Sequence, residues 1–140
     1  ELLTELILSA YRDLAECVEA AVDSRKNPAR QLTEIAQSLR RWASAEPQRY
    51  LLLYGTPVPG YHAPAAATEL ARRIFAPILE GFSLANSADP PASAFKRSIT
   101  FWTRLHGVLS LELAGHFTGM DVDPEQLYRD EVRSLLGATG

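Results

Sequence analysis

The sequence contains a single cysteine, Cys17, among its 140 residues. A disulfide within the chain needs a second cysteine and a cysteine-based zinc site needs several, so the composition excludes both. The chain also lacks a signal peptide and any apolar run near the roughly 18 residues that a membrane-spanning helix requires. We therefore expect a protein of the cytoplasm with no membrane partner.

The chain has little basic charge gathered in one place. Its net charge is -3, and its basic residues stand singly or in pairs such as Arg40-Arg41 and Arg72-Arg73. Without a concentrated basic patch, we do not expect this chain alone to bind DNA. The glycine-containing stretch 55–60 carries prolines where a phosphate-binding loop needs free backbone amides. The sequence therefore predicts no nucleotide and no other cofactor.

Catalytic motifs are also missing. The histidines, His62, His106 and His116, stand in neither a nucleophile motif nor a zinc motif. Glu112 and His116, four positions apart, could offer two ligands to a metal, but an ordinary surface pair is the better interpretation. We therefore expect no enzyme, no catalytic residue and no metal site.

No segment alternates apolar and polar residues as a strand does, whereas apolar residues recur every three or four positions. Proline and glycine mark the breaks between the periodic segments. The predicted helices cover about 22 residues from Leu3, residues 28–45, a short helix within 48–54, a helix beyond Pro64 that Pro77 interrupts, residues 93–117 and residues 124–137. The sequence thus predicts an all-α bundle of about six helices, folded as one domain over residues 1–140.

Helix starts are signalled at two places. Asn27 and Pro28 predict an N-cap followed by proline at the first helical position. Asp123, Pro124 and Gln126 predict the same arrangement with a capping-box glutamine. The first periodic segment has neither a cap nor a methionine before it, so we expect another segment to precede it.

The predicted helix 93–117 is apolar on most sides. At 100° per residue, a bulky stripe and a small-residue stripe lie about 100° apart, and Phe101, Leu105 and Val108 form a third apolar side. The bulky stripe contains Phe95, Ile99, Trp102, His106, Leu109, Leu113 and Phe117, and the small stripe contains Thr103, Gly107, Ser110 and Ala114. Glycine inside a helix costs about 1 kcal/mol relative to alanine. Close packing of another helix on the small stripe would explain Gly107.

The small stripe predicts a homodimer. The expected interface contains Thr103, Gly107, Ser110, Leu111, Ala114 and Thr118, with Tyr128, Val132 and Leu135 of the last helix. Two helices from each of two subunits would make a four-helix bundle with two-fold symmetry. Periodicity alone leaves open the alternative that both faces pack within one subunit.

A set of mainly aromatic residues predicts a pocket for a small, apolar effector. The candidate ligand-binding residues are Tyr11, Trp42, Tyr54, Phe75, Ile78, Trp102 and His106. An indole, a phenol and an imidazole among apolar side chains are typical of a ligand pocket, and a helix bent at a proline can leave a cavity. The alternative is that these residues are plain core, with His106 satisfying a core hydrogen bond instead of touching a ligand.

Two motifs together resemble a known family. The first is the segment 47–61, Pro-Gln-Arg-Tyr-Leu-Leu-Leu-Tyr-Gly-Thr-Pro-Val-Pro-Gly-Tyr, and the second is Trp102-x-x-x-His106-Gly107. They resemble the C-terminal regulatory domain of TetR-family transcriptional regulators, in the subgroup named for a Trp-His-Gly signature. The resemblance covers essentially the whole chain.

The resemblance implies an upstream helix-turn-helix domain of about 50 residues, absent from this sequence, that binds operator DNA. It also implies dimerisation through the last two helices and an effector held among the first five. The effector would shift the population of states through the first helix, most commonly in a repressor. The other interpretation is a standalone helical small-molecule or lipid-binding protein, or an enzyme. The effector, the operator, the regulated genes and the choice between repressor and activator are not predicted.

Overall fold

The computed structural model describes residues 1–137, which form six α-helices and no strand. The helices are α1 (Leu2–Ala20), α2 (Pro28–Ala45), α3 (Pro47–Tyr54), α4 (Ala65–Ala85), α5 (Pro91–Leu113) and α6 (Pro124–Gly137). The predicted all-α fold of about six helices is confirmed. Residues 138–140 of the predicted domain lie outside the described part.

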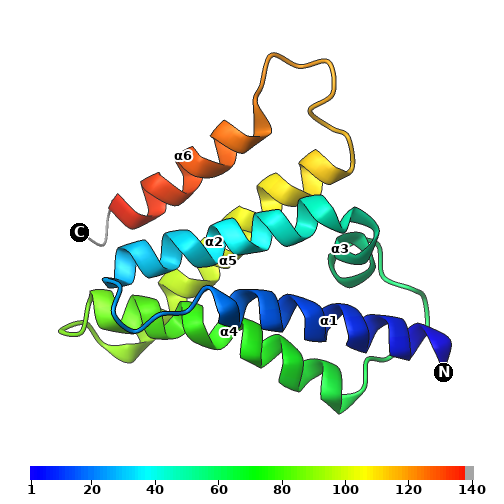
Figure 1. Ribbon diagram of the computed structural model, residues 1–140, viewed down its shortest axis with the longest axis horizontal. Coiled ribbons are helices and arrows are strands. Elements are labelled where there is room, and N and C mark those ends of the chain that lie inside the picture. Colours follow the sequence, from blue (N-terminus) through cyan, green and yellow to red (C-terminus); the bar gives the residue numbers. More distant parts are fainter. Residues whose placement is uncertain (138–140) are drawn as a thin grey trace.

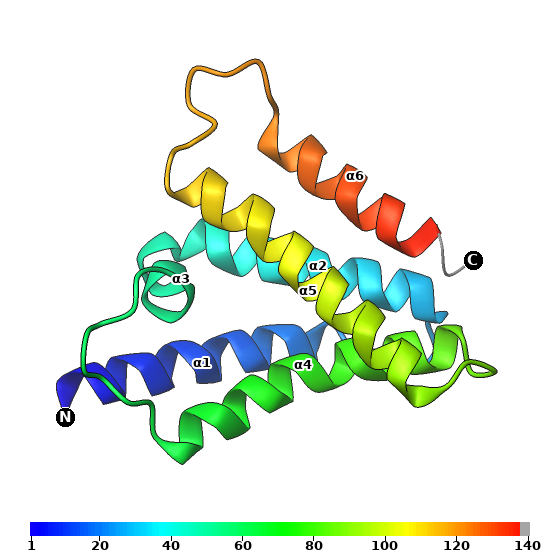
Figure 2. The same cartoon turned by 180° about the vertical axis from the view of Figure 1, so that it is seen from behind.

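The helices form a layered bundle with α6 at one side (Figures 1 and 2). Helix α1 runs beside α4, and both of them contact α2. Helix α5 contacts α2 and α4, while among the described helices α6 packs against α5 and α2 only. The short helix α3 lies at one end of the bundle, in contact with α1, α2 and α5. It therefore places its side chains between the first and the fifth helix.

The predicted start of α2 is confirmed, because the Asn27 side chain accepts a hydrogen bond from the Arg30 backbone N–H at 2.8 Å. At α6 the Asp123 side chain accepts from the Glu125 backbone N–H instead. The Gln126 side chain donates to Asp130 on its own helix, so the predicted capping box is not formed.

Helix α5 ends at Leu113, four residues before the predicted end at Phe117. Gly115 has a φ of +83°, a left-handed conformation that suits glycine. The His116 backbone N–H donates to the Leu111 carbonyl, and the Gly115 N–H donates to the Glu112 carbonyl. This pair of hydrogen bonds is a Schellman motif, which terminates the helix and moves Phe117 into the following turn.

The apolar sides of α5 are not equally buried. Phe101, Leu105 and Val108 of the third apolar side are buried, whereas Phe95 and Ile99 of the bulky stripe are 53% and 39% exposed. The reason is the placement of the neighbours, since α4 meets the side of α5 that carries Phe101, whose ring centroid lies 5.3 Å from that of Phe82. The third apolar side is therefore core, and two of the seven residues of the bulky stripe lie at the surface.

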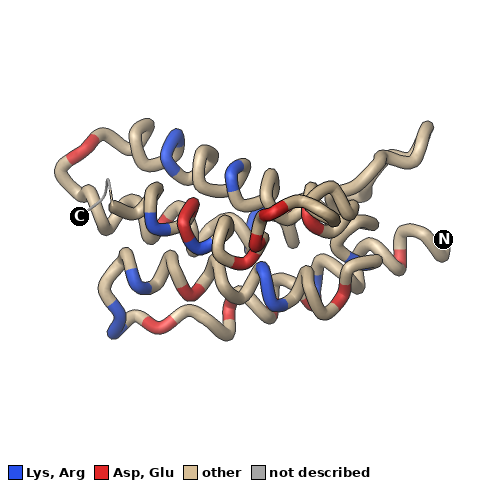
Figure 3. Tube along the Cα trace, turned by 90° about the horizontal axis from the view of Figure 1, so that it is seen from above, with Lys and Arg blue, Asp and Glu red and all other residues tan. Residues whose placement is uncertain are grey.

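Polar side chains tie the helices together. The Arg40 guanidinium of α2 makes a bidentate ion pair with Glu112 of α5, and both side chains are mostly buried. Gln31 is buried and its amide bonds the Ala21 carbonyl and the Asp23 N–H, both just beyond the end of α1. Along the described helices, basic and acidic positions are interspersed (Figure 3). This pattern agrees with the scattered basic residues of the sequence.

None of the helices within residues 1–137 is both long and apolar enough to cross a membrane.

Candidate ligand-binding site

The candidate site forms where α3 faces α5. Tyr50 and Tyr54 stand one turn apart on α3, and Trp102 and His106 stand one turn apart on α5. The ring centroids of Tyr54 and His106 are 4.4 Å apart, and those of Trp102 and His106 are 4.1 Å apart. The rings thus form one continuous cluster between the two helices.

Local sequence explains why α3 ends with Tyr54 at this position. Proline at the first position suits the start of the helix, because that residue needs no backbone N–H. At Gly55 an added Cβ would lie 2.4 Å from the Leu51 carbonyl oxygen, so a side chain does not fit the observed backbone. Glycine therefore permits the sharp exit from the helix that leaves Tyr54 as its last residue.

His106 has one satisfied and one unsatisfied ring nitrogen. Its Nδ1 lies 2.6 Å from the Tyr50 hydroxyl, which also lies 3.3 Å from the Ser110 hydroxyl. Its Nε2 is buried and has no hydrogen-bond partner within residues 1–137. Burial lowers the pKa of the His106 imidazole to about 4, because the charged form loses its hydration. The imidazole is therefore neutral at neutral pH.

Two grooves open on either side of the Tyr54–Trp102 pair, whose ring centroids are 6.0 Å apart. The α5 groove has a volume of about 330 Å³ and is lined by Tyr54, Trp102, Thr103, His106, Gly107 and Ser110. The α4 groove has a volume of about 340 Å³ and is lined by Tyr11, Tyr54, Thr68, Ala71, Arg72, Phe75, Phe95, Ile99 and Trp102. Both volumes lie at the low end of the roughly 300–1,000 Å³ typical of ligand sites.

The structure brings together five of the seven predicted ligand-binding residues. They line the α5 groove, the α4 groove or both, and they are Tyr11, Tyr54, Phe75, Trp102 and His106. The other two lie elsewhere: the indole N–H of Trp42 donates to Asp13 at 3.0 Å, and Ile78 is buried in the core. Neither Trp42 nor Ile78 lines a groove at this site.

The predicted interface residues are divided between surface and core. Thr103, Gly107, Leu111, Ala114 and Thr118 are exposed, Ser110 and Leu135 are partly buried, and Tyr128 and Val132 are buried in the core of this chain. The last two pack towards α2, where the Tyr128 hydroxyl donates to the Ala36 carbonyl. Their burial within this chain corrects the assignment of Tyr128 and Val132 to the interface.

Gly107 makes no close approach to another part of residues 1–137, because an added Cβ would meet nothing within 4 Å there. Together with Thr103 and Ser110 it lines the α5 groove beside His106. His106 and Gly107, which stand on different stripes of the helix, therefore border the same groove, His106 through its ring and Gly107 through its bare backbone.

The candidate site also contains residues that were not predicted as ligand-binding. Tyr50 orients His106, and Phe95 and Ile99 supply exposed apolar surface to the α4 groove. The four-residue spacing of Tyr50 and Tyr54 was a signal for a shared helix face. The exposure of Phe95 and Ile99 has no such signal, because the sequence does not show which side of α5 is covered.

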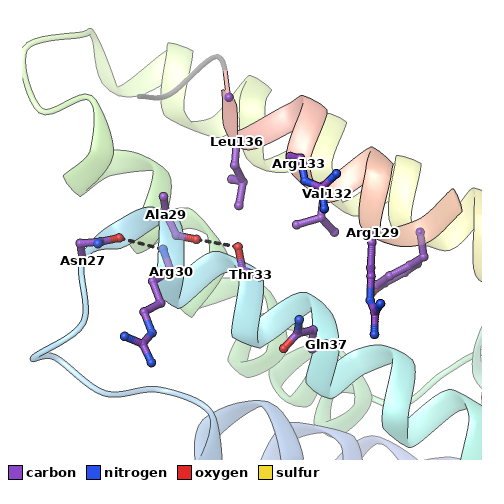
Figure 4. A pocket seen from close by; sticks show the side chains of 11 residues that line it. Asn27, Ala29, Arg30, Thr33, Gln37, Arg129, Val132, Arg133 and Leu136 are labelled. Atoms are coloured by element: carbon purple, nitrogen blue, oxygen red, sulfur yellow. Dashed lines mark hydrogen bonds between the residues drawn. The ribbon is translucent and has the colours of Figure 1, made fainter. Parts of the chain in front are cut away.

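A larger cavity lies between α2 and α6, away from the ring cluster. Its volume is about 490 Å³, and Val132 and Leu136 point from α6 towards Ala29 and Thr33 of α2 (Figure 4). The arginines at its rim, which are Arg30, Arg129 and Arg133, each pair with a carboxylate on their own helix. This cavity is therefore an apolar cleft with arginines at its rim that are paired with surface carboxylates.

Within residues 1–137, no three histidine, cysteine, aspartate or glutamate side chains are placed to hold a metal ion. Glu112, considered above beside His116, is bound to Arg40.

Comparisons with known proteins place the chain among regulators. Residues 32–135 match the family described as "Tetracyclin repressor-like, C-terminal domain". The HTH-type transcriptional regulators Rv1816 of Mycobacterium tuberculosis and Mb1846 of Mycobacterium bovis are each 32% identical to it, over 97% of this chain and 71% of the relative. The crystal structure of a regulatory protein, SCO4313, matches with a TM-score of 0.85 at 43% identity, over 97% of this chain and 72% of that chain.

Proposed function

The chain belongs to the TetR family of transcriptional regulators, and we propose that residues 1–140 form the domain with which such a regulator binds a small, largely apolar effector and pairs with a second copy. The observation that carries effector binding is the ring cluster. Tyr54, Trp102 and His106 border two grooves, and a buried nitrogen of His106 has no partner within residues 1–137. Apolar walls with a few polar groups are typical of ligand sites.

We propose that a helix-turn-helix domain preceding this chain binds DNA. We also propose that the whole protein acts in the cytoplasm. The relatives are named as helix-turn-helix regulators, and the match covers 71% of their length. Their names favour a regulator over an enzyme or a carrier. Repression is the proposed mode, in which the effector favours a state that does not fit the operator.

Helix α1 is the proposed connection between effector and DNA. Its Tyr11 lines the α4 groove, with a ring centroid 6.4 Å from that of Tyr54. Near its start, the Thr4 hydroxyl is hydrogen-bonded to the Tyr61 hydroxyl at 3.0 Å, in the segment that follows α3. A ligand that moves Tyr54 therefore acts on α1 through Tyr11. The ligand shifts the equilibrium between two positions of α1 only to the extent that it binds one of these states more tightly than the other.

Removing the ring cluster is expected to abolish ligand retention. The full-length regulator purified from its host should carry a small molecule in native mass spectrometry. The double variant Trp102→Ala, His106→Ala should retain at least about tenfold less, since a loss of about 1.4 kcal/mol weakens binding tenfold. His62→Ala with His116→Ala is the matched control, because both histidines are exposed. Equal retention by the ring-cluster variant would contradict an effector site here.

A charge on the exposed face of α5 is expected to break the dimer. Leu111 is 46% exposed in the single chain and stands beside the small-residue stripe. Leu111→Glu should raise the dimer dissociation constant at least about 100-fold in sedimentation, because association would bury an unpaired carboxylate.

Leu84→Glu is the control for this variant, because Leu84 is 61% exposed on α4, away from the proposed interface. It should leave the dimer unchanged. Dimers that survive Leu111→Glu and dissociate with Leu84→Glu would move the interface to α4.

A further inference from the structure

The unpaired Nε2 of His106 indicates which chemical group the ligand carries. A buried polar atom without a partner is costly, so folded proteins satisfy nearly all of them. Within the described residues, His106 Nε2 is the one buried side-chain nitrogen or oxygen without a hydrogen bond. It lies in the candidate site and not in a remote part of the core, since His106 lines the α5 groove.

The hydrogen bonds around His106 decide whether Nε2 carries a proton. If the Tyr50 hydroxyl donates to Nδ1, then Nε2 must carry the ring proton of the neutral imidazole, and the Ser110 hydroxyl donates to the Tyr50 oxygen. In the reverse arrangement, the bare Nε2 lone pair would face the electron-rich rings of Tyr54 and Trp102. An N–H tolerates aromatic neighbours better than a lone pair does. Nε2 is therefore a hydrogen-bond donor that lacks an acceptor.

The α5 groove offers no charge to a ligand. Its lining consists of aromatic, hydroxyl and glycine residues with the neutral His106. The α4 groove holds a single charged side chain, Arg72, which is paired with Glu69 at 2.8 Å. An ionised ligand would therefore lose its hydration without gaining a counter-ion.

The Tyr54 side chain is held by contacts of its ring with neighbouring aromatic rings. Its hydroxyl has no hydrogen-bond partner within the described residues, and Tyr54 is the last residue of α3, next to Gly55. Its ring, together with that of Trp102, separates the α5 groove from the α4 groove and covers His106. Moving Tyr54 aside would join the grooves and uncover Nε2.

We propose that the effector is an uncharged, mainly apolar molecule that carries a hydrogen-bond acceptor such as a carbonyl oxygen, and that this oxygen accepts the N–H of His106 Nε2 once Tyr54 has moved aside. The inference rests on the proposed effector site and adds the chemistry that the site selects. Tyr50 is a positioning residue, because its hydroxyl is hydrogen-bonded to His106 Nδ1 and orients the ring. A hydrocarbon of the same shape would fill the grooves but leave Nε2 unpaired.

A matched pair of probes tests this chemistry. 1-Tetralone and tetralin share a fused ring system, and only the ketone has an acceptor. Calorimetry on the full-length protein should show tetralone binding about tenfold tighter than tetralin. In His106→Phe the preference should disappear, and in the control His116→Phe it should persist. The matching tetralin carboxylate should bind more weakly than tetralone.

The possible outcomes separate the two proposals. Equal affinities for tetralone and tetralin would be consistent with the effector site but would contradict the proposal that the ligand carries an acceptor for Nε2. If the carboxylate bound most tightly of the three probes, the proposal that the effector is uncharged would be contradicted. Binding of neither tetralone nor tetralin would overturn the site and this inference together. Should His106→Phe fail to fold, nitrogen NMR of the unchanged protein decides the tautomer: a proton on Nε2 supports the proposal, and a proton on Nδ1 overturns it.

Discussion

Lowering the pH from 6.5 to 4 is expected to reduce the free energy of unfolding by about 2–3 kcal/mol through His106 alone. The pKa of His106 is about 4 in the folded protein and 6.5 for an unperturbed imidazole. Between these values the unfolded state binds a proton that the folded state refuses, so unfolding becomes more favourable as the pH falls. The contribution is fully present above pH 6.5 and is lost as the pH falls through 4.

The surroundings of His106 make this effect separable from other titrations. Its hydrogen-bonded and stacked neighbours are Tyr50, Tyr54 and Trp102, and no carboxylate contacts it in the described structure. Denaturant unfolding at several pH values should therefore show a steeper loss of stability in the wild type than in His106→Phe. Parallel curves would mean that the imidazole is hydrated in the folded protein.

Gly81→Val is expected to destabilise the protein by about 2–3 kcal/mol. Gly81 is buried on α4, and a Cβ added there would lie 2.7 and 2.8 Å from Cδ2 and Cγ of Leu32 on α2. Leu32 is itself fully buried, so its side chain has no free space to move into. Valine is a better helix former than glycine by a few tenths of a kcal/mol, which does not offset the overpacking.

Glu80→Val is the matched control, because Glu80 is the exposed neighbour of Gly81 on the same helix. It should change the free energy of unfolding by less than about 0.5 kcal/mol. Thermal or denaturant unfolding measures both variants. A Gly81→Val protein as stable as the wild type would mean that α4 and α2 do not meet at this glycine.

The helices could be predicted because their boundaries depend on local chemistry. Proline opens α2, α3 and α6, and Asn27 provides the predicted cap. The end of α5 depends on an equally local signal, Gly115, but the periodic apolar pattern continues past this glycine to Phe117 and predicts a helix that is too long. The left-handed conformation of Gly115 ends the helix there, although the apolar residues keep their helical spacing beyond it.

Burial could not be predicted where a helix is apolar on several sides. In α5 the periodic pattern fits Phe95 and Phe101 equally well, yet one ring is half exposed and the other is fully buried. Only the positions of α2 and α4 distinguish them. The bond between Tyr50 and His106 is similarly inaccessible, because it joins residues 56 positions apart through the orientation of a short helix. The shared face of Trp102 and His106, in contrast, follows from helical spacing alone.

The α5 groove is bordered both by residues of the proposed dimer interface and by residues of the proposed ligand site. Thr103, Gly107 and Ser110 border it on the side where we propose that the second copy docks, and Tyr54 and Trp102 border it on the ligand side. With the proposed dimer, the partner lies at the rim of each ligand site, so effector binding and subunit association are thermodynamically linked, and each changes the other by the same factor. The sensitivity of the regulator to its effector then depends on how much regulator the cell contains.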